Sequence, residues 1–151
     1  MKINFKSIFG LKTKSTVKLS VDKDGIDYDK HVDFYYSNLI NSLILFTLTT
    51  NDLEKHAGPV FNPISELDSE IDYAFIPVCF DTIFRNELID NSFRNELLEF
   101  KKSTDEIPSE IWDWEFIDNH ETWISIRQKA NVLLDKLCVS NRTYNDHSTL
   151  T

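Results

Sequence analysis

The sequence predicts a mainly α-helical protein: a single compact helical domain of five or six helices with a small N-terminal β-hairpin. Apolar residues recur at three- and four-residue steps over most of the chain, which is the period of helices packed on one face. The chain has 151 residues and is 41% apolar, so it can bury one core. It contains three glycines, which are too few for the repeated turns of an all-β fold.

Residues 16–28 differ from the rest and predict the β-hairpin. Apolar residues alternate with polar ones from Val17 to Val21 and again from Ile26 to Tyr28. The intervening Asp22-Lys23-Asp24-Gly25 is typical of a turn. Because an isolated hairpin is marginally stable in water, we expect it to pack on the helical body, residues 30–138.

The first predicted helix runs from about residue 30 to residue 54 and stops before Gly58-Pro59. Its apolar stripe indicates one face turned to a core. The stripe consists of Val32, Tyr36, Leu39, Ile40, Leu43 and Phe46.

Two prolines divide the middle of the chain. Asn62 is a predicted N-cap with Pro63 at the first helical position, and the helical pattern continues as far as Pro77. A third apolar segment covers residues 76–88. Proline removes a backbone donor and crowds the preceding turn, so the pattern is consistent both with one helix kinked at Pro77 and with two separate helices.

Three more helical segments are predicted after these. Residues 91–103 form a helix capped by one of its first two residues, and Pro108 can open a brief helix that includes Trp112 and Trp114. Asp118 and Glu121 have the spacing of a capping box at the start of the last helix. These segments complete one domain, residues 1–138.

The apolar stripe of the last helix runs from Trp123 to Leu137. After it comes a polar tail, residues 139–151, which we expect to fray because it offers little apolar surface to bury.

Charge is unevenly distributed along the chain. It has 25 Asp and Glu against 16 Lys and Arg, a formal net charge of −9. Residues 1–30 contain seven lysines and four aspartates, so residues 31–151 carry nine cations and 21 carboxylates, a net −12. A surface of that sign repels nucleic-acid phosphates and anionic lipid and attracts cations. We therefore expect a basic protein partner, no nucleic acid and no membrane, and the oligomeric state stays open.

Lysines interleave with Phe5, Phe9 and Leu11 near the N-terminus. Such an arm could touch phosphates or lipid headgroups. We favour the alternative that its lysines pair with the acidic body, which would repel any polyanion.

The expected location is cytoplasmic. Residues 1–20 lack the continuous apolar run of a signal peptide. The most apolar window, Leu39–Leu48, is about half of the ~20 residues that a membrane-spanning helix needs. Cys79 and Cys138 are predicted to be free thiols in a reducing compartment.

The most unusual stretch is residues 103–123, which holds seven carboxylates, no Lys or Arg, and three tryptophans. Like charges repel one another, and a basic partner would relieve that cost. Aromatic anchors within a charged rim are also typical of binding hot spots. The alternative is that the tryptophans are core and the carboxylates only solvate a helix pair. The predicted partner-binding residues are Glu110, Trp112, Asp113, Trp114, Glu115, Asp118 and Glu121.

No cofactor, metal site or catalytic residue is expected. The four histidines lack metal-ligand spacing, and neither cysteine has a neighbouring cation or a second cysteine that would activate it. Residues 22–29 suggest a calcium loop, but Ser20 and His31 would occupy ligand positions, so a solvated turn is favoured over a cation site. Carboxylate groups such as Asp113 with Glu115, or Glu66, Glu70 and Asp81, could converge, but spacing alone does not define a catalytic pair.

These patterns favour a protein-binding module rather than an enzyme. In size, acidity and lack of catalytic motifs the chain is similar to inhibitors and immunity-type antitoxins, which guard a bacterial cell by occluding a basic toxin. The likeness is one of composition, without a family motif. One alternative is an adaptor or structural subunit that self-associates through Leu39–Leu48, and another is a carboxylate- or metal-dependent hydrolase.

Overall fold

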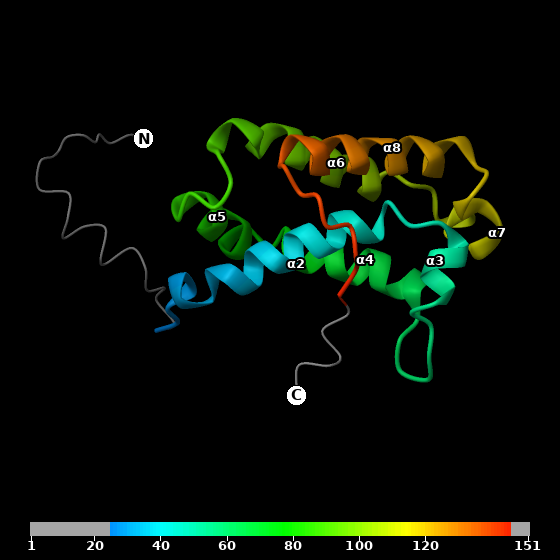
Figure 1. The fold of residues 1–151 in the computed structure, drawn as a ribbon, viewed down its shortest axis with the longest axis horizontal. Helices are drawn as coiled ribbons and strands as arrows, with labels where there is room; N and C mark the ends of the chain where they lie inside the picture. The colour runs from blue at the N-terminus through cyan, green and yellow to red at the C-terminus, as the bar shows by residue number, and fades with distance from the viewer. Residues whose placement is uncertain (1–24, 146–151) are drawn as a thin grey trace, which may run out of the picture.

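A computed structural model describes residues 25–145, and over these residues the protein is mainly α-helical, as predicted (Figure 1). Helices α2 and α4 pack side by side, α6 and α8 pack side by side above them, and α2 also contacts α5 and α8. The described elements are η1 (Tyr28–His31), α2 (Val32–Leu45), α3 (Thr50–Glu54), α4 (Pro63–Ala74), α5 (Pro77–Arg85), η2 (Asn91–Phe93), α6 (Arg94–Asp105), η3 (Ser109–Ile111), α7 (Trp114–Ile117) and α8 (Glu121–Lys136), where η marks a 3-10 helix.

Helix α2 is the centre of the core. Every residue from Asn38 to Phe46 is buried, because α4, α5 and α8 surround this part of the helix. Leu39 and Leu43 have no exposed surface. The window Leu39–Leu48 therefore packs within the fold, and self-association through this stripe loses the surface that it would need.

The single helix predicted over residues 30–54 is wrong, because the chain forms α2 and α3 there with a break between them. The hydroxyl of Thr47 donates to the carbonyl of Ile44 at 2.6 Å, and Thr49 caps α3 by accepting from the backbone N–H of Asp52. Threonine side chains compete in this way with the backbone bonds of a continuous helix. This break accounts for seven α-helices in the described chain instead of five or six.

Both prolines start helices. Asn62 caps α4 by accepting from the N–H of Ile64 at 3.1 Å, with Pro63 in the first turn as predicted. Pro77 is the first residue of α5, and two residues separate it from the end of α4 at Ala74. Of the two alternatives left open by the sequence, Pro77 therefore separates two helices.

Helices α5 and α8 end without glycine. Glu87 and Cys138 follow them with φ of 60°, a left-handed conformation that glycine usually supplies. Beyond Cys138, the N–H of Val139 reaches back to the carbonyl of Leu134 at 2.9 Å, and α5 ends with the same pattern. These bonds satisfy the last carbonyls of each helix and offset the cost of the conformation.

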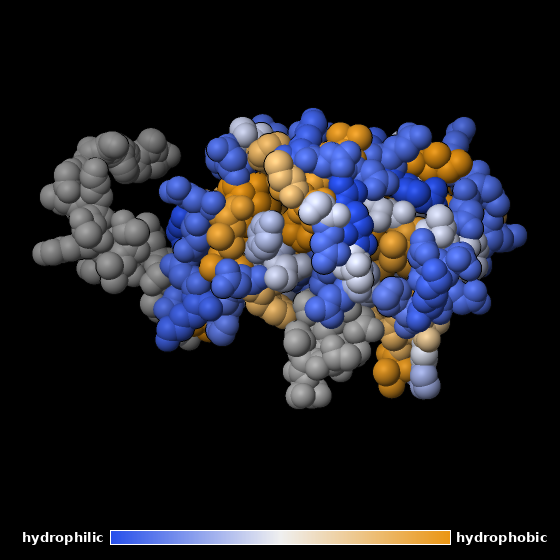
Figure 2. All heavy atoms as spheres, viewed as in Figure 1, coloured by the Kyte–Doolittle hydropathy of each residue, from blue (hydrophilic) through white to orange (hydrophobic). Residues whose placement is uncertain are grey.

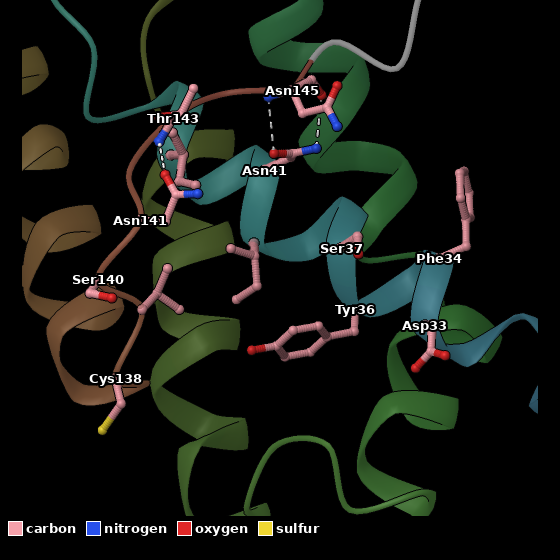
Figure 3. Close-up of a pocket in the computed structure, with 13 residues that line it drawn as sticks. Asp33, Phe34, Tyr36, Ser37, Asn41, Cys138, Ser140, Asn141, Thr143 and Asn145 are labelled. Carbon is pink, nitrogen blue, oxygen red and sulfur yellow. Dashed lines mark hydrogen bonds between the residues drawn. The ribbon is translucent and has the colours of Figure 1, made fainter. Parts of the chain in front are cut away.

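The segment Val139–Asn145 lies across the middle of the molecule, over α2 (Figure 1). Tyr144 is 4% exposed, and its hydroxyl lies 3.1 Å from Oε1 of Glu70. The side chain of Asn41 donates to the carbonyl of Asn145 at 2.9 Å and accepts from its N–H at 3.3 Å (Figure 3). The prediction of a frayed tail is therefore wrong for this segment.

The predicted hairpin is not supported. Residues 16–24 lie outside the described residues, and Tyr28 begins the 3-10 helix η1 rather than ending a strand. Asp29 in η1 accepts from Arg85 and Asn86 at the end of α5. Within residues 25–145, none of the helices is long and apolar enough to cross a bilayer.

Candidate functional site

The predicted partner-binding residues lie in η3, in α7 and at the start of α8. We call this region, residues 110–121, the acidic end. The brief helix predicted after Pro108 is present as two short helices, and Trp112 lies between them with φ and ψ of −79° and 67°. Helix α7 lies at one end of the molecule beside α3, and hydrophilic side chains dominate the visible face there (Figures 1 and 2).

The three tryptophans have different environments. Trp123 is 3% exposed, and its indole N–H donates to the carbonyl of Ile111 at 2.7 Å. The half-buried ring of Trp112 meets the ring of Trp123 edge-on, with centroids 4.9 Å apart. Trp114 is 38% exposed. Trp123 is therefore a core residue, as the alternative interpretation expected of all three tryptophans, and Trp114 is the indole that faces solvent.

Four predicted carboxylates are exposed without ion pairs among the described residues. They belong to Glu110, Asp113, Glu115 and Glu121. Asp113 occupies the N-cap position of α7, but its side chain makes no capping hydrogen bond. Glu110 accepts a long hydrogen bond from its neighbour Ser109 at 3.3 Å. These carboxylates therefore lie at the surface without a cation from residues 25–145 beside them.

Asp118 is engaged within the fold. Its Oδ1 accepts from the N–H of Thr50 at 2.9 Å, and its Oδ2 accepts from the Thr50 hydroxyl. These two hydrogen bonds lower the pKa of Asp118, and the bond from the Thr50 hydroxyl has the larger effect. The positive charge of Arg127, 3.9 Å away, lowers this pKa further. The carboxylate thus ties α7 to the first turn of α3.

The capping box predicted from Asp118 and Glu121 is wrong. His120 is the N-cap of α8, because its Nδ1 accepts from the N–H of Thr122 at 3.1 Å. Asp118 lies two residues before that N-cap position and bonds to α3 instead. Glu121 is the first residue of α8, where the positive end of the helix dipole favours a carboxylate.

Lys101 is a residue that the sequence argument missed. Its Nζ lies 2.9 Å from Asp72 of α4 and also pairs with Asp105, so part of the acidic stretch is neutralised from α6. Burial opposes the effect, but these hydrogen bonds raise the pKa of Lys101. The four-residue spacing from Lys101 to Asp105 was a usable signal, because such residues are neighbours on a helix.

A hollow of about 470 Å³ lies between η3 and α4, beside the acidic end. Trp112 lines it together with Asp68 and Ser109. Burial, then the nearby Asp72, raises the pKa of Asp68. Trp112 therefore forms a wall of a cleft in this protein, whereas Trp114 projects outward.

The hollow beside the C-terminal segment is larger, about 650 Å³, and none of its lining residues belongs to α7 (Figure 3). Its ionisable lining residues are Asp33, Tyr36 and Cys138, which stand at separate positions around it (Figure 3). Cys138 is exposed and Cys79 is buried, and both thiols are free. Burial raises the pKa of Cys79, which keeps that thiol protonated.

Two other carboxylates considered for catalysis have structural partners. Asp81 pairs with Arg94, and Glu70 accepts from Tyr144. Over residues 25–145, no group of three or more His, Cys, Asp or Glu side chains is placed to hold a metal ion.

Comparison with known proteins adds no relative. No protein-family model matches the chain, and neither a curated protein nor a solved structure shows significant similarity to it. The functional argument therefore depends on the geometry and charge described above.

Proposed function

We propose that this protein is a stoichiometric binding module that occludes a basic partner protein, in the manner of an inhibitor or immunity-type antitoxin. The observation that carries this proposal is the set of exposed carboxylates around Trp114. Glu110, Asp113, Glu115 and Glu121 have no ion pairs among the described residues, although Asp105 and Asp118 beside them do.

In the free protein these carboxylates repel one another. Like charges close together raise the free energy of the folded chain, and contact with lysine or arginine side chains would remove that cost. A negative surface also steers a basic protein toward it and speeds association at low salt. An exposed indole at the centre supplies the apolar anchor that such an interface needs.

The site consists of the residues that face solvent. Trp114, with Asp113 and Glu115 beside it, forms its centre, and Glu110 and Glu121 form its edges. Asp118 and Trp112 support this site from within the fold. Asp118 bonds to Thr50 of α3, and the Trp112 ring packs against Trp123. A partner would therefore displace little of the protein's own structure.

The test is capture of a basic protein from an extract of the organism that carries the gene. The immobilised protein is compared with the variant D113N/W114A/E115Q and with a matched control, D33N/F34A/E87Q. The control also removes two exposed carboxylates and an exposed ring, away from α7. We expect one basic protein, identified by mass spectrometry, to be retained by the native chain and the control and lost by the first variant. Equal recovery on all three would refute the site.

A further inference from the structure

A groove lies between α6 and α8. The two helices are antiparallel: Lys129 donates to Ser103 at 3.3 Å, and Lys136 pairs with Glu96 at 2.7 Å. Two hollows of about 440 and 460 Å³ lie between them. Both are lined by Ser103, Ser125 and Lys129, so they form one continuous groove.

The groove has an apolar base and small residues at its middle. Phe100 and Leu133 line it from the core and are nearly fully buried. Val132 lines the same part and is 48% exposed, so an apolar methyl surface faces water there. Ser103 and Ser125 stand where the two hollows meet, and the Lys129 side chain reaches from α8 to the Ser103 hydroxyl there.

Carboxylates border the groove on both helices. Glu99 and Glu106 come from α6 and its end, and Glu121 from the start of α8. These three have no ion pairs among the described residues, whereas Glu96 at the far end is paired with Lys136. The groove opens at Glu106 and Glu121, and Glu121 belongs to the acidic end.

The dimensions suit a helix. From Glu121 to Val132 the axis of α8 advances about 16 Å, at roughly 1.5 Å per residue, which is about three helical turns. An amphipathic helix binds such a groove by placing residues three and four apart on the apolar base. Its flanking residues would then face the carboxylates on either side.

We propose that the groove between α6 and α8 binds an amphipathic α-helix of the basic partner, with its apolar face on Val132 and its lysines or arginines toward Glu99, Glu106 and Glu121. This inference rests on the proposed function and specifies the partner's binding element. Charge complementarity favours a basic helix, because three of the carboxylates along the groove form no ion pair with the described residues.

Lys129 sets the register of the bound helix. It is the cation at the middle of the groove, and its described hydrogen bond goes to the hydroxyl of Ser103. A basic helix must therefore place an uncharged or acidic residue opposite it. Removing this charge by Lys129→Gln should strengthen the binding of an all-lysine helix severalfold.

The first experiment measures fluorescence anisotropy of a labelled synthetic peptide of about 15 residues, long enough to form a helix on binding. It has leucines at three- and four-residue steps and lysines elsewhere, and its twin carries glutamates in place of lysines. The full chain should bind the lysine peptide at least tenfold more tightly than the twin, and added salt should weaken that binding. Equal binding of the two peptides would overturn the proposal.

The location is tested with a matched pair of variants. Val132→Asp should weaken peptide binding at least tenfold, whereas Val60→Asp, at an exposed valine outside the groove, should leave it unchanged. Ser125→Tyr fills the groove from an exposed position and should also abolish binding. Circular dichroism shows whether each variant is folded. Undiminished binding by a folded Ser125→Tyr variant would overturn the location.

Failure of the groove and failure of the proposed function give different results. If Ser125→Tyr still retains the basic partner and D113N/W114A/E115Q loses it, the function stands and the groove is refuted. If neither variant loses a partner, both proposals fail. If no basic partner is captured, but the lysine peptide binds and Val132→Asp abolishes that binding, the groove is supported and the site at Trp114 is refuted.

Discussion

Two polar stretches of this protein differ in how the fold treats their polar groups. In the acidic end, residues 110–121, four carboxylates and Trp114 face solvent. In the segment Val139–Asn145, Tyr144 is buried and polar groups find partners on α2 and α4. The difference is whether a residue far away in the sequence forms a hydrogen bond or an ion pair with each polar group. Polar groups that the fold satisfies hold the structure together, and those that it leaves unmatched are available to a partner.

The largest expected effect concerns Tyr144. Its ring packs against His56 and Phe61, so Tyr144→Ala leaves a cavity and should lower the free energy of unfolding by about 3 kcal/mol. Tyr144→Phe keeps the ring and loses the hydroxyl near Glu70, at a cost of about 1 kcal/mol. Urea denaturation followed by circular dichroism measures both. A Tyr144→Ala variant as stable as the native chain would show that this segment does not secure the core.

A middle effect is expected at Asp118, the carboxylate of the acidic end that the fold does use. Asp118→Asn weakens the bonds to the first turn of α3 and should cost about 1 kcal/mol, as the loss of a helix cap does. The matched variant Asp113→Asn has no such bond to lose. Equal stability of the two variants would contradict the distinction drawn between these carboxylates.

The pH dependence of this effect has a definite sign. The pKa of Asp118 is lower in the folded chain than its ordinary value of 3.8, so the unfolded chain binds a proton more readily. The stabilisation by Asp118 is therefore complete above that ordinary value and is lost as the pH falls through the lower folded-state pKa. Thermal melts between neutral and acid pH should show a smaller difference between native and Asp118→Asn proteins at the acid end of the range.

The smallest effect on stability is expected at Asp113 and Glu115, where we expect the largest effect on binding of the basic partner. The variant D113N/E115Q should change the free energy of unfolding by less than about 0.5 kcal/mol, with a tendency to stabilise, because it removes repulsion and no ion pair among the described residues. The same urea experiment measures it. A loss of more than about 1 kcal/mol would mean that these carboxylates support the fold.

The helices were predictable where local chemistry fixes them. The apolar stripes of α2 and α8, and Asn62 followed by Pro63, are visible in sequence because they depend on near neighbours. The helix ends at Glu87 and Cys138 could not be predicted. Glycine usually marks such ends, and here Glu87 and Cys138 adopt the left-handed conformation in its place. The break before α3 depends on threonine hydroxyls that also occur within helices.

The candidate site was predictable in composition and less so in detail. The run of carboxylates and the tryptophans within it are visible in the local sequence. The engagement of Asp118 depends on Thr50, which is 68 residues away, and no local pattern indicates that contact. The groove between α6 and α8 was missed for the same reason, since it exists only when two distant helices are side by side.

The burial of every residue from Asn38 to Phe46 has a consequence for synthesis of the chain. Asn41 meets Asn145 across 104 residues, so a nascent chain that has emerged as far as α8 still lacks the segment that covers its central helix. Ribosomes add roughly 5–20 residues per second, so α2 waits several seconds for that cover. During that interval the part of α2 that this segment covers is exposed to chaperones and to other nascent chains.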